Sequence, residues 1–134
     1  MVSRYLNRQA TSDEVDTALK ANPSEDLIPP QGVFFVARED DQISGCVGLR
    51  SRPLRTGEVT RLFVTPAARG RGLASRLMHE LEMYARDRGL ATLRLDTRDD
   101  LVEARRLYVR HGYEEVAPFN RGTHSNLWFE KILT

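Results

Sequence analysis

The chain has 134 residues, of which 40% are hydrophobic and 29% charged, a balance typical of a soluble globular protein with a buried core. Its formal net charge of +1 lacks the basic excess of a general nucleic-acid binder, and no apolar run approaches the ~20 residues of a membrane span. With one cysteine and no secretory signal, the sequence predicts a single cytoplasmic domain over residues 1–134, without an internal disulfide.

The first third of the chain predicts a short helix followed by two strands. Thr11 and Glu14 fit a capping box, and the apolar residues after them predict a short helix that ends near residues 22–23. The almost wholly apolar segment 33–37 predicts a strand covered on both faces, and residues 43–49 predict its hairpin partner. Cys46 in the second strand is interpreted as a small buried apolar residue.

A strand, a glycine-bearing loop and a long helix come next, and the chain is organised around them. Residues 58–64 predict a central strand, and Gly70 and Gly72 precede the helix. Apolar residues at helical spacing form one face of that helix: Leu73, Leu77, Leu81 and Tyr84. The free N–H groups and the positive dipole end of a helix bind phosphate, and glycine lets a ligand approach the backbone. The segment therefore predicts a phosphate or pyrophosphate site, to which Arg69 and Arg71 add positive charge.

The loop has other interpretations. From the two glycines alone, an ordinary tight turn remains open. A P-loop needs lysine and then serine or threonine after the second glycine, where this chain has Leu73 and Ala74. A dinucleotide-binding fingerprint needs a third glycine at Ser75 and a shorter link from the strand. Both of these phosphate-binding loops therefore fit poorly.

The remaining third predicts one more helix among three strands. Residues 91–96 alternate between apolar and polar and predict a strand. Residues 102–111 predict an amphipathic helix capped by Gly112, and His111 in its last turn suits the helix dipole. Two further strands are predicted at residues 113–116 and 126–133. No two histidines stand at metal-ligand spacing and there is no C-x-x-C motif, so we predict no metal site.

Two motifs carry a resemblance to a known family. The loop Arg69-x-x-Gly72-x-Ala74 resembles the Q/R-x-x-G-x-G/A acyl-CoA loop of the GNAT N-acetyltransferases. Residues 104–113, ARRLYVRHGY, are similar to that family's A-x-x-L-Y-x-x-x-G-F/Y segment. The resemblance implies an α/β fold with a mixed, mostly antiparallel central sheet and helices on both faces. It also implies that the strand at residues 91–96 splays from the central strand, with the pantetheine arm of the cofactor in the gap.

The resemblance further implies transfer of an acetyl group from acetyl-CoA, the co-substrate, to a primary amine of a small molecule or a protein. No nucleophile motif supports a covalent acetyl-enzyme, so we expect direct attack in a ternary complex, without a metal. The implied cofactor-binding residues are Phe63, Val64, Arg69, Gly70, Arg71, Gly72, Leu73 and Ala74. The implied acceptor contacts are Phe119, Asn120, Arg121 and His124, whereas Trp128 is interpreted as a core residue.

Glu58 and Tyr108 are the implied catalytic residues. Acyl transfer needs a neutral amine, and a lysine amine has a pKa of ~10.4, so Glu58 is predicted to remove the proton, directly or through water, or to orient the substrate. The family motif puts Tyr108 beside the thioester sulfur, where its hydroxyl donates to the leaving thiolate. Ordinary pKa values of ~10 for tyrosine and ~8.5 for a thiol make full proton transfer uphill by ~2 kcal/mol. Without the resemblance, Tyr108 is a packed aromatic residue.

Two features depart from the family pattern. Leu101 stands where the family commonly has asparagine, so either cofactor affinity falls or Asp99 or Asp100 substitutes. Few residues precede the first predicted helix, which predicts a shortened N-terminal lobe. The edge of the strand at residues 33–37 is then paired by a weak strand at residues 2–6, paired by another chain in a homodimer, or left open.

A non-catalytic acyl-CoA-binding or sensing domain, which keeps the loop without the chemistry, is the alternative to an enzyme. A nucleotide-phosphate binder is a weaker one. The combination of Tyr108 and Glu58 favours the enzyme. The acceptor is left open among amino acids, polyamines, aminoglycosides and protein N-termini.

Overall fold

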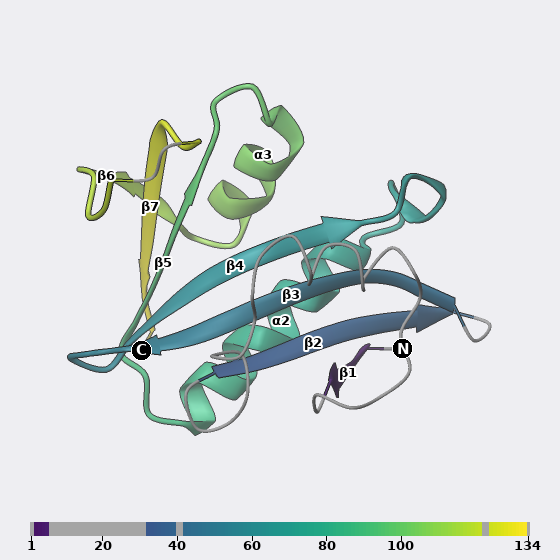
Figure 1. The fold of residues 1–134 in the computed structure, drawn as a ribbon, viewed down its shortest axis with the longest axis horizontal. Coiled ribbons are helices and arrows are strands. Elements are labelled where there is room, and N and C mark those ends of the chain that lie inside the picture. The colour runs from purple at the N-terminus through teal and green to yellow at the C-terminus, as the bar shows by residue number, and fades with distance from the viewer. Residues whose placement is uncertain (1, 6–31, 40–41, 122–123, 134) are drawn as a thin grey trace.

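One mixed sheet organises the computed structural model, which describes residues 2–5, 32–39, 42–121 and 124–133. In this part of the chain seven strands lie in the order β1-β2-β3-β4-β5-β7-β6 (Figure 1). The strands are β1 (Val2–Tyr5), β2 (Gly32–Glu39), β3 (Gln42–Arg52), β4 (Thr56–Val64), β5 (Thr92–Thr97), β6 (Glu114–Val116) and β7 (Leu127–Ile132). The helices are η1 (Pro66–Ala68), α2 (Leu73–Asp87) and α3 (Val102–Arg110). The predicted α/β fold with a mixed, mostly antiparallel sheet is confirmed.

The parallel pair β4 and β5 opens a gap in the sheet. Every other pair of neighbouring strands is antiparallel. The two parallel strands are in register over three pairs, the last of which joins Glu58 to Arg94. Beyond this pair β4 continues to Val64 and β5 to Thr97 without mutual pairing, and the strands diverge (Figure 1). The implied splay between these strands is therefore present.

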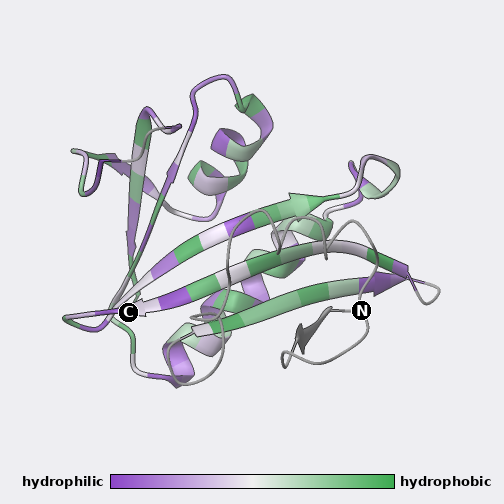
Figure 2. Cartoon of the chain, in the orientation of Figure 1, coloured by the Kyte–Doolittle hydropathy of each residue, from purple (hydrophilic) through white to green (hydrophobic). Residues whose placement is uncertain are grey.

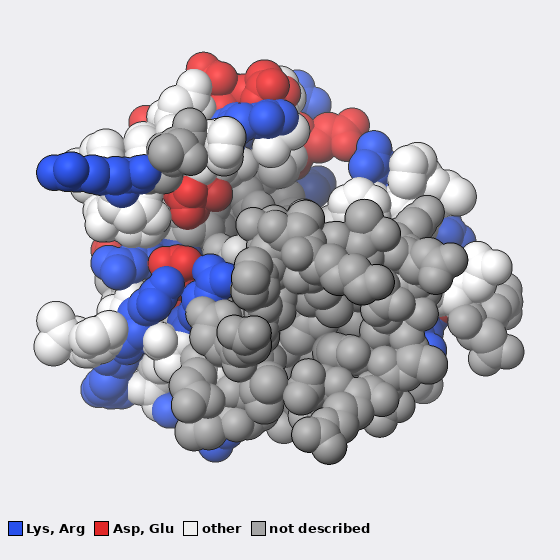
Figure 3. All heavy atoms as spheres, in the orientation of Figure 1, with Lys and Arg blue, Asp and Glu red and all other residues white. Residues whose placement is uncertain are grey.

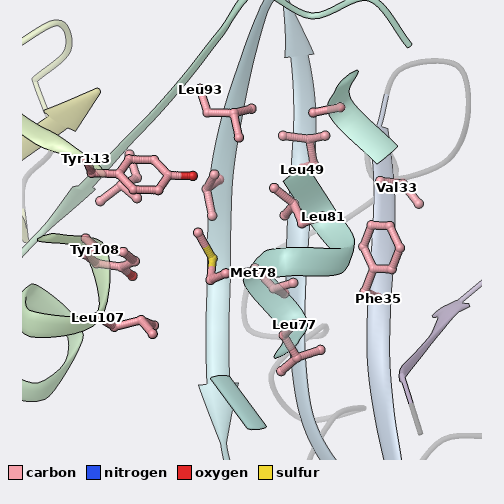
Figure 4. Packing of buried hydrophobic residues seen from close by; sticks show 14 of the residues in the cluster. Val33, Phe35, Leu49, Leu77, Met78, Leu81, Leu93, Leu107, Tyr108 and Tyr113 are labelled. Atoms are coloured by element: carbon pink, nitrogen blue, oxygen red, sulfur yellow. The ribbon is translucent and has the colours of Figure 1, made fainter. Parts of the chain in front are cut away.

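The helix α2 lies behind β2, β3 and β4 in the view of Figure 1 and buries its apolar face against them. Leu77, Met78 and Leu81 are completely buried between helix and sheet, as the amphipathic pattern predicted (Figure 4). Apolar residues follow one another along β2 without alternation (Figure 2). A second buried cluster accordingly occupies the other face of the sheet, with Phe34, Val36, Ile43 and Cys46. The helix predicted before residues 22–23 lies outside the described residues.

Glycine ends both long helices in the same way. Gly112 follows α3 with φ 89°, its N–H donates to the Val109 carbonyl, and the next N–H donates to the Tyr108 carbonyl. Gly89 follows α2 with φ 76° and makes the equivalent bonds to the last turn of that helix. These are Schellman caps, which need a left-handed residue at this position. The cap predicted at Gly112 is confirmed.

The N-terminal strand decides how the edge of β2 is covered. Of the three arrangements left open by the sequence, the structure has the first: β1 pairs antiparallel with β2, from Val2 opposite Ala37 to Tyr5 opposite Phe34. The expected shortening does not leave β2 as an open edge, since β1 supplies its backbone partners. An unpaired β2 edge therefore no longer supports a homodimer, and homodimer formation stays an untested prediction.

Hydrogen exchange tests this pairing. In an antiparallel ladder alternate N–H groups of β2 point to β1 and the others to β3. We expect protection of both sets in the intact chain at any protein concentration. Deleting residues 2–5 is expected to speed exchange only in the β1-facing set, so the β3-facing set is an internal control. Protection that fades on dilution would instead indicate a second chain at this edge.

Candidate active site

The loop before α2 presents free backbone donors to open space. Gly70 and Gly72 have φ of 80° and 75°, in the left-handed region, and Gly72 is the N-cap of the helix. The first three N–H groups of the helix, from Leu73 to Ser75, have no partner within the helix. A Cβ atom built at either glycine meets nothing within 4 Å. The glycines therefore serve the backbone conformation and the access of a ligand, and packing within the protein does not require them.

This loop forms one wall of a cleft of about 770 Å³, a size typical of small-molecule sites. The end of β4 and the helices α2 and α3 form the rest of the wall. Of the eight predicted cofactor residues, seven line this cleft: Phe63, Val64, Arg69, Gly70, Gly72, Leu73 and Ala74. Arg71 does not, because its guanidinium forms an ion pair with Glu39 at 2.7 Å. Arg71 was predicted to add positive charge to the loop, but its guanidinium lies instead against the end of β2.

A bulge turns the end of β4 toward the cleft. The register with β3 shifts between Cys46 and Gly48, so that Arg61 and Leu62 lie in the irregular stretch, and Arg61 has φ 57°. A left-handed non-glycine residue inside a strand has no signal in the sequence. The bulge leaves the Phe63 side chain 39% exposed at the cleft. Arg69 then ties the loop to this strand end, since its Nε donates to the Val64 carbonyl at 3.0 Å.

Tyr108 lies behind the wall of the cleft. It is 6% exposed and its ring contacts the rings of Tyr113 and Phe129 at centroid distances of 5.9 and 6.0 Å. Its neighbour Leu107 lines the cleft, but Tyr108 is absent from the lining. Burial, with a smaller contribution from the charge of Asp96, raises the pKa of Tyr108 to about 12. The hydroxyl is therefore fully protonated at neutral pH and suited to donating a hydrogen bond.

Glu58 lies at the base of the gap between β4 and β5, within an arginine pair. Its carboxylate is 3.4 Å from Arg50 Nη1 and 3.4 Å from Arg52 Nε, and its side chain is 14% exposed. It lies outside the cleft lining, on the far side of the sheet from α2, because its neighbours Gly57 and Val59 face the core. The structure thus separates Glu58 from the glycine loop across the sheet and leaves both predicted roles, base and substrate orientation, open to test.

The predicted acceptor residues divide into two pairs. The ring of Phe119 lies 4.6 Å from the Arg94 guanidinium, and Asn120 accepts from the Trp128 indole at 2.9 Å. Arg121 and His124 are exposed, and neither forms a hydrogen bond or an ion pair with another described residue. Trp128 is half-buried beside Asn120 and outside both core clusters, so its interpretation as a core residue is wrong.

A buried polar network between α2, α3 and β7 was missed by the sequence analysis. Glu82 is 4% exposed and accepts from Lys131 Nζ at 2.7 Å and from the Tyr113 hydroxyl at 3.1 Å. His111 Nδ1 lies 3.9 Å from Glu82, and Nε2 lies 2.8 Å from the hydroxyl of Ser75, which lines the cleft. Glu82 lies four residues after Met78, on the buried face of α2. A carboxylate at such a position was the signal in the sequence from which a buried polar network could have been predicted.

The same network changes the interpretation of His111. Burial is the main influence on its pKa, which is lowered despite the opposing charge of Glu82. The neutral ring is then favoured near pH 7, so the predicted attraction of a charged imidazole to the α3 dipole is not its principal interaction. Its hydrogen bond to Ser75 instead connects α3 to the first turn of α2.

Breaking this network should destabilise the fold. Lys131→Met removes the cation nearest Glu82 while keeping the aliphatic length, and it leaves a buried carboxylate with an incomplete set of partners. We expect a loss of about 3 kcal/mol in the free energy of unfolding, measured by urea denaturation. Arg86→Met is the control, because Arg86 is 43% exposed at 3.9 Å from Glu82 and should cost less than about 1 kcal/mol. Equal effects of the two variants would contradict the network.

The family departure at Leu101 has no substitute in the cleft. Leu101 is the N-cap of α3, without a side-chain cap, and is 43% exposed. Asp100 pairs with Arg98 at 3.1 Å, and the backbone of Asp99 bonds to Asn126 and Arg105. Neither aspartate lines the cleft, so the predicted replacement of asparagine by one of them is not observed.

The described residues contain neither a membrane-spanning helix nor a metal-binding cluster. None of the helices in that part of the chain is long and apolar enough to cross a membrane. Among the same residues, no group of three or more His, Cys, Asp or Glu side chains could hold a metal ion.

Comparison with known proteins agrees with the fold. The model of the acetyltransferase (GNAT) family matches residues 3–113. An uncharacterized N-acetyltransferase of Schizosaccharomyces pombe is 32% identical over 98% of this chain and 83% of its own length. The IAA acetyltransferase of Azospirillum brasilense is 36% identical over 69% of this chain and 61% of its own.

Solved structures share the whole architecture. A candidate acyl-CoA N-acyltransferase of Klebsiella pneumoniae has a TM-score of 0.85 at 26% identity, covering 100% of this chain and 97% of its own. A GNAT family acetyltransferase of Elizabethkingia anophelis with acetyl-CoA bound has a TM-score of 0.75 at 17% identity, covering 99% and 97%. The match of the family model across most of the sequence, together with this fold, means that the chain belongs to the acetyltransferase (GNAT) family.

Proposed function

We propose that this chain transfers the acetyl group of acetyl-CoA to a primary amine by direct attack in a ternary complex. The observation that carries the proposal is the cleft in which the glycine loop, the first turn of α2 and the bulged end of β4 come together. The loop N–H groups bind the pyrophosphate, and a backbone N–H of the bulged strand near Phe63 or Val64 meets the oxyanion that forms at the thioester carbon. The acetyl-CoA-bound relative of the same fold supports this use of the cleft.

The two proposed catalytic residues serve the two ends of the reaction. The amine nitrogen forms a bond to the acetyl carbon while the bond from that carbon to sulfur breaks, and the electron pair leaves on sulfur. The amine proton passes to Glu58, directly or through water. Tyr108 donates a hydrogen bond to the thiolate as charge develops there. Its pKa of about 12 against ~8.5 for a free thiol makes complete proton transfer uphill by ~5 kcal/mol, so the hydrogen bond is its role.

A titration and an amine screen test the proposal together. Calorimetry with acetyl-CoA measures binding to the cleft, and thiol release from acetyl-CoA measures transfer to a panel of amino acids, polyamines, aminoglycosides and an N-terminal peptide. We expect binding and acceptor-dependent thiol release. Absence of binding would contradict the cofactor site. Binding without transfer to any acceptor would favour the non-catalytic acyl-CoA-binding domain.

A further inference from the structure

The sheet face turned away from α2 carries a group of charged residues around the gap. Leu49, Val59 and Leu93 are in the core on the α2 side, so the residues adjacent to them in β3, β4 and β5 lie on the opposite face. Charged members of this face are Arg50, Arg52, Glu58, Arg94, Asp96 and Glu130. Acidic and basic side chains lie side by side on the face seen in Figure 3. This mixed surface surrounds the base of the gap between β4 and β5, on the opposite face of the sheet from α2.

Arg94 differs from the other arginines of this face. Arg50 and Arg52 both contact the Glu58 carboxylate, whereas Arg94 has no ion pair or hydrogen bond within the described residues. It is half-buried, and its Nε is a fully buried donor without a partner. A buried donor that lacks a partner is costly, which makes this guanidinium a group that a ligand would satisfy.

The surroundings of Arg94 fix its orientation. Its guanidinium lies over the ring of Phe119, a predicted acceptor contact, with 4.6 Å between guanidinium carbon and ring centroid. Stacking on an aromatic ring holds the planar fork in place and leaves its edge for a second planar group. In the sheet Arg94 is the register partner of Glu58, at the last paired position before β4 and β5 diverge. A guanidinium without a counterion and a carboxylate thus lie next to each other at the base of the gap.

We propose that Arg94 binds a carboxylate of the acceptor, so that the acceptor is a primary amine that also carries a carboxylate, with a free amino acid as the simplest member. A guanidinium matches a carboxylate with two parallel hydrogen bonds. Glu58 beside it suits the ammonium group of the same molecule. The nearby carboxylates of Asp96 and Glu130 favour a monoanion over a phosphate dianion, since like charges repel. The proposal rests on the acetyl transfer proposed above and specifies its acceptor.

Matched substrate pairs test this assignment. Free amino acids are compared with their carboxamides, which keep the amine and remove the charge, by following thiol release from acetyl-CoA. For the wild type we expect kcat/KM to favour the acid by roughly 10- to 100-fold, the effect of hydrogen bonds to a charged group. In Arg94→Gln the ratio of kcat/KM for the acid to kcat/KM for the carboxamide should fall to about 1, through loss of activity on the acid alone. Arg94→Lys should retain part of the preference for the acid. Arg98→Gln, an equal charge change at an exposed residue beyond β5, should leave the ratio unchanged.

A binding measurement keeps the test independent of turnover. Trp128 is the single tryptophan of the chain and lies opposite Asp96, two register pairs from the pair that Arg94 forms with Glu130. Its fluorescence should respond to titration of the acid in wild type and Arg98→Gln, but respond much more weakly to the amide or in Arg94→Gln. Equal activity on acids and amides, a preference that survives in Arg94→Gln, or transfer to polyamines only would overturn the proposal. Failure of acetyl-CoA binding in calorimetry would instead contradict the proposed function itself.

Discussion

Tyr108→Phe should lower turnover by ~10²–10⁴ with little change in acetyl-CoA affinity, because the variant loses a hydrogen bond to the leaving thiolate that forms only during the reaction. The ring packs between Tyr113 and Phe129, and phenylalanine preserves this packing. Affinity is spared because the thioester sulfur of bound acetyl-CoA carries no charge before the reaction begins. Turnover comes from thiol release with an accepted amine, and affinity from calorimetric titration with acetyl-CoA. Tyr84→Phe is the control, because its hydroxyl contacts Arg88 at the far end of α2.

The pH dependence follows from the raised pKa of Tyr108. A hydroxyl with a pKa of about 12 keeps its proton below that pH and loses it as the pH rises through this value. Deprotonation of Tyr108 therefore should not reduce the rate of the wild type below about pH 11. A loss of activity on the alkaline side near pH 10, absent in Tyr108→Phe, would contradict the buried environment. If turnover of Tyr108→Phe falls by less than threefold, Tyr108 has only a packing role.

Gly72→Glu should abolish measurable acetyl-CoA binding, a loss of at least about 100-fold in affinity, while the fold survives. The Cβ position of Gly72 faces open space, so the new side chain enters the region where the pyrophosphate meets the free N–H groups. Its carboxylate takes the favourable position at the positive end of the α2 dipole and repels the anionic cofactor. Calorimetry gives the affinity, and circular dichroism with thermal unfolding checks the fold.

Gly89→Glu is a closely matched control for this variant. Gly89 follows the same helix at its other end, has φ of 76° against 75° for Gly72, and also has nothing within 4 Å of a built Cβ. Both substitutions force a left-handed glutamate, so their backbone costs are similar. Only Gly72→Glu should affect acetyl-CoA. Unchanged affinity in Gly72→Glu, or equal losses in both variants, would refute the assignment of the loop.

The sequence alone determined the elements and the loop. The all-apolar segment in β2 and the helical spacing of Leu77 and Leu81 depend on local periodicity, which a buried core enforces. Gly112 predicted a left-handed cap because few other residues adopt that conformation without strain. The resemblance to the family added the order of these parts, and with it the expected splay of β5 from β4.

Only the tertiary structure decided which side chains meet. The ion pair of Arg71 with Glu39 links residues 32 positions apart, and no local pattern distinguishes it from the cleft-lining Arg69. The bulge at Arg61 exists because β3 holds the strand on either side of an irregular stretch. Arg94 is in register with Glu58, but Arg50 and Arg52 of β3 already contact that carboxylate. Arg94 is therefore left without a counterion among the described residues. Such pairings depend on contacts between strands and helices far apart in the chain, to which a single sequence gives no direct access.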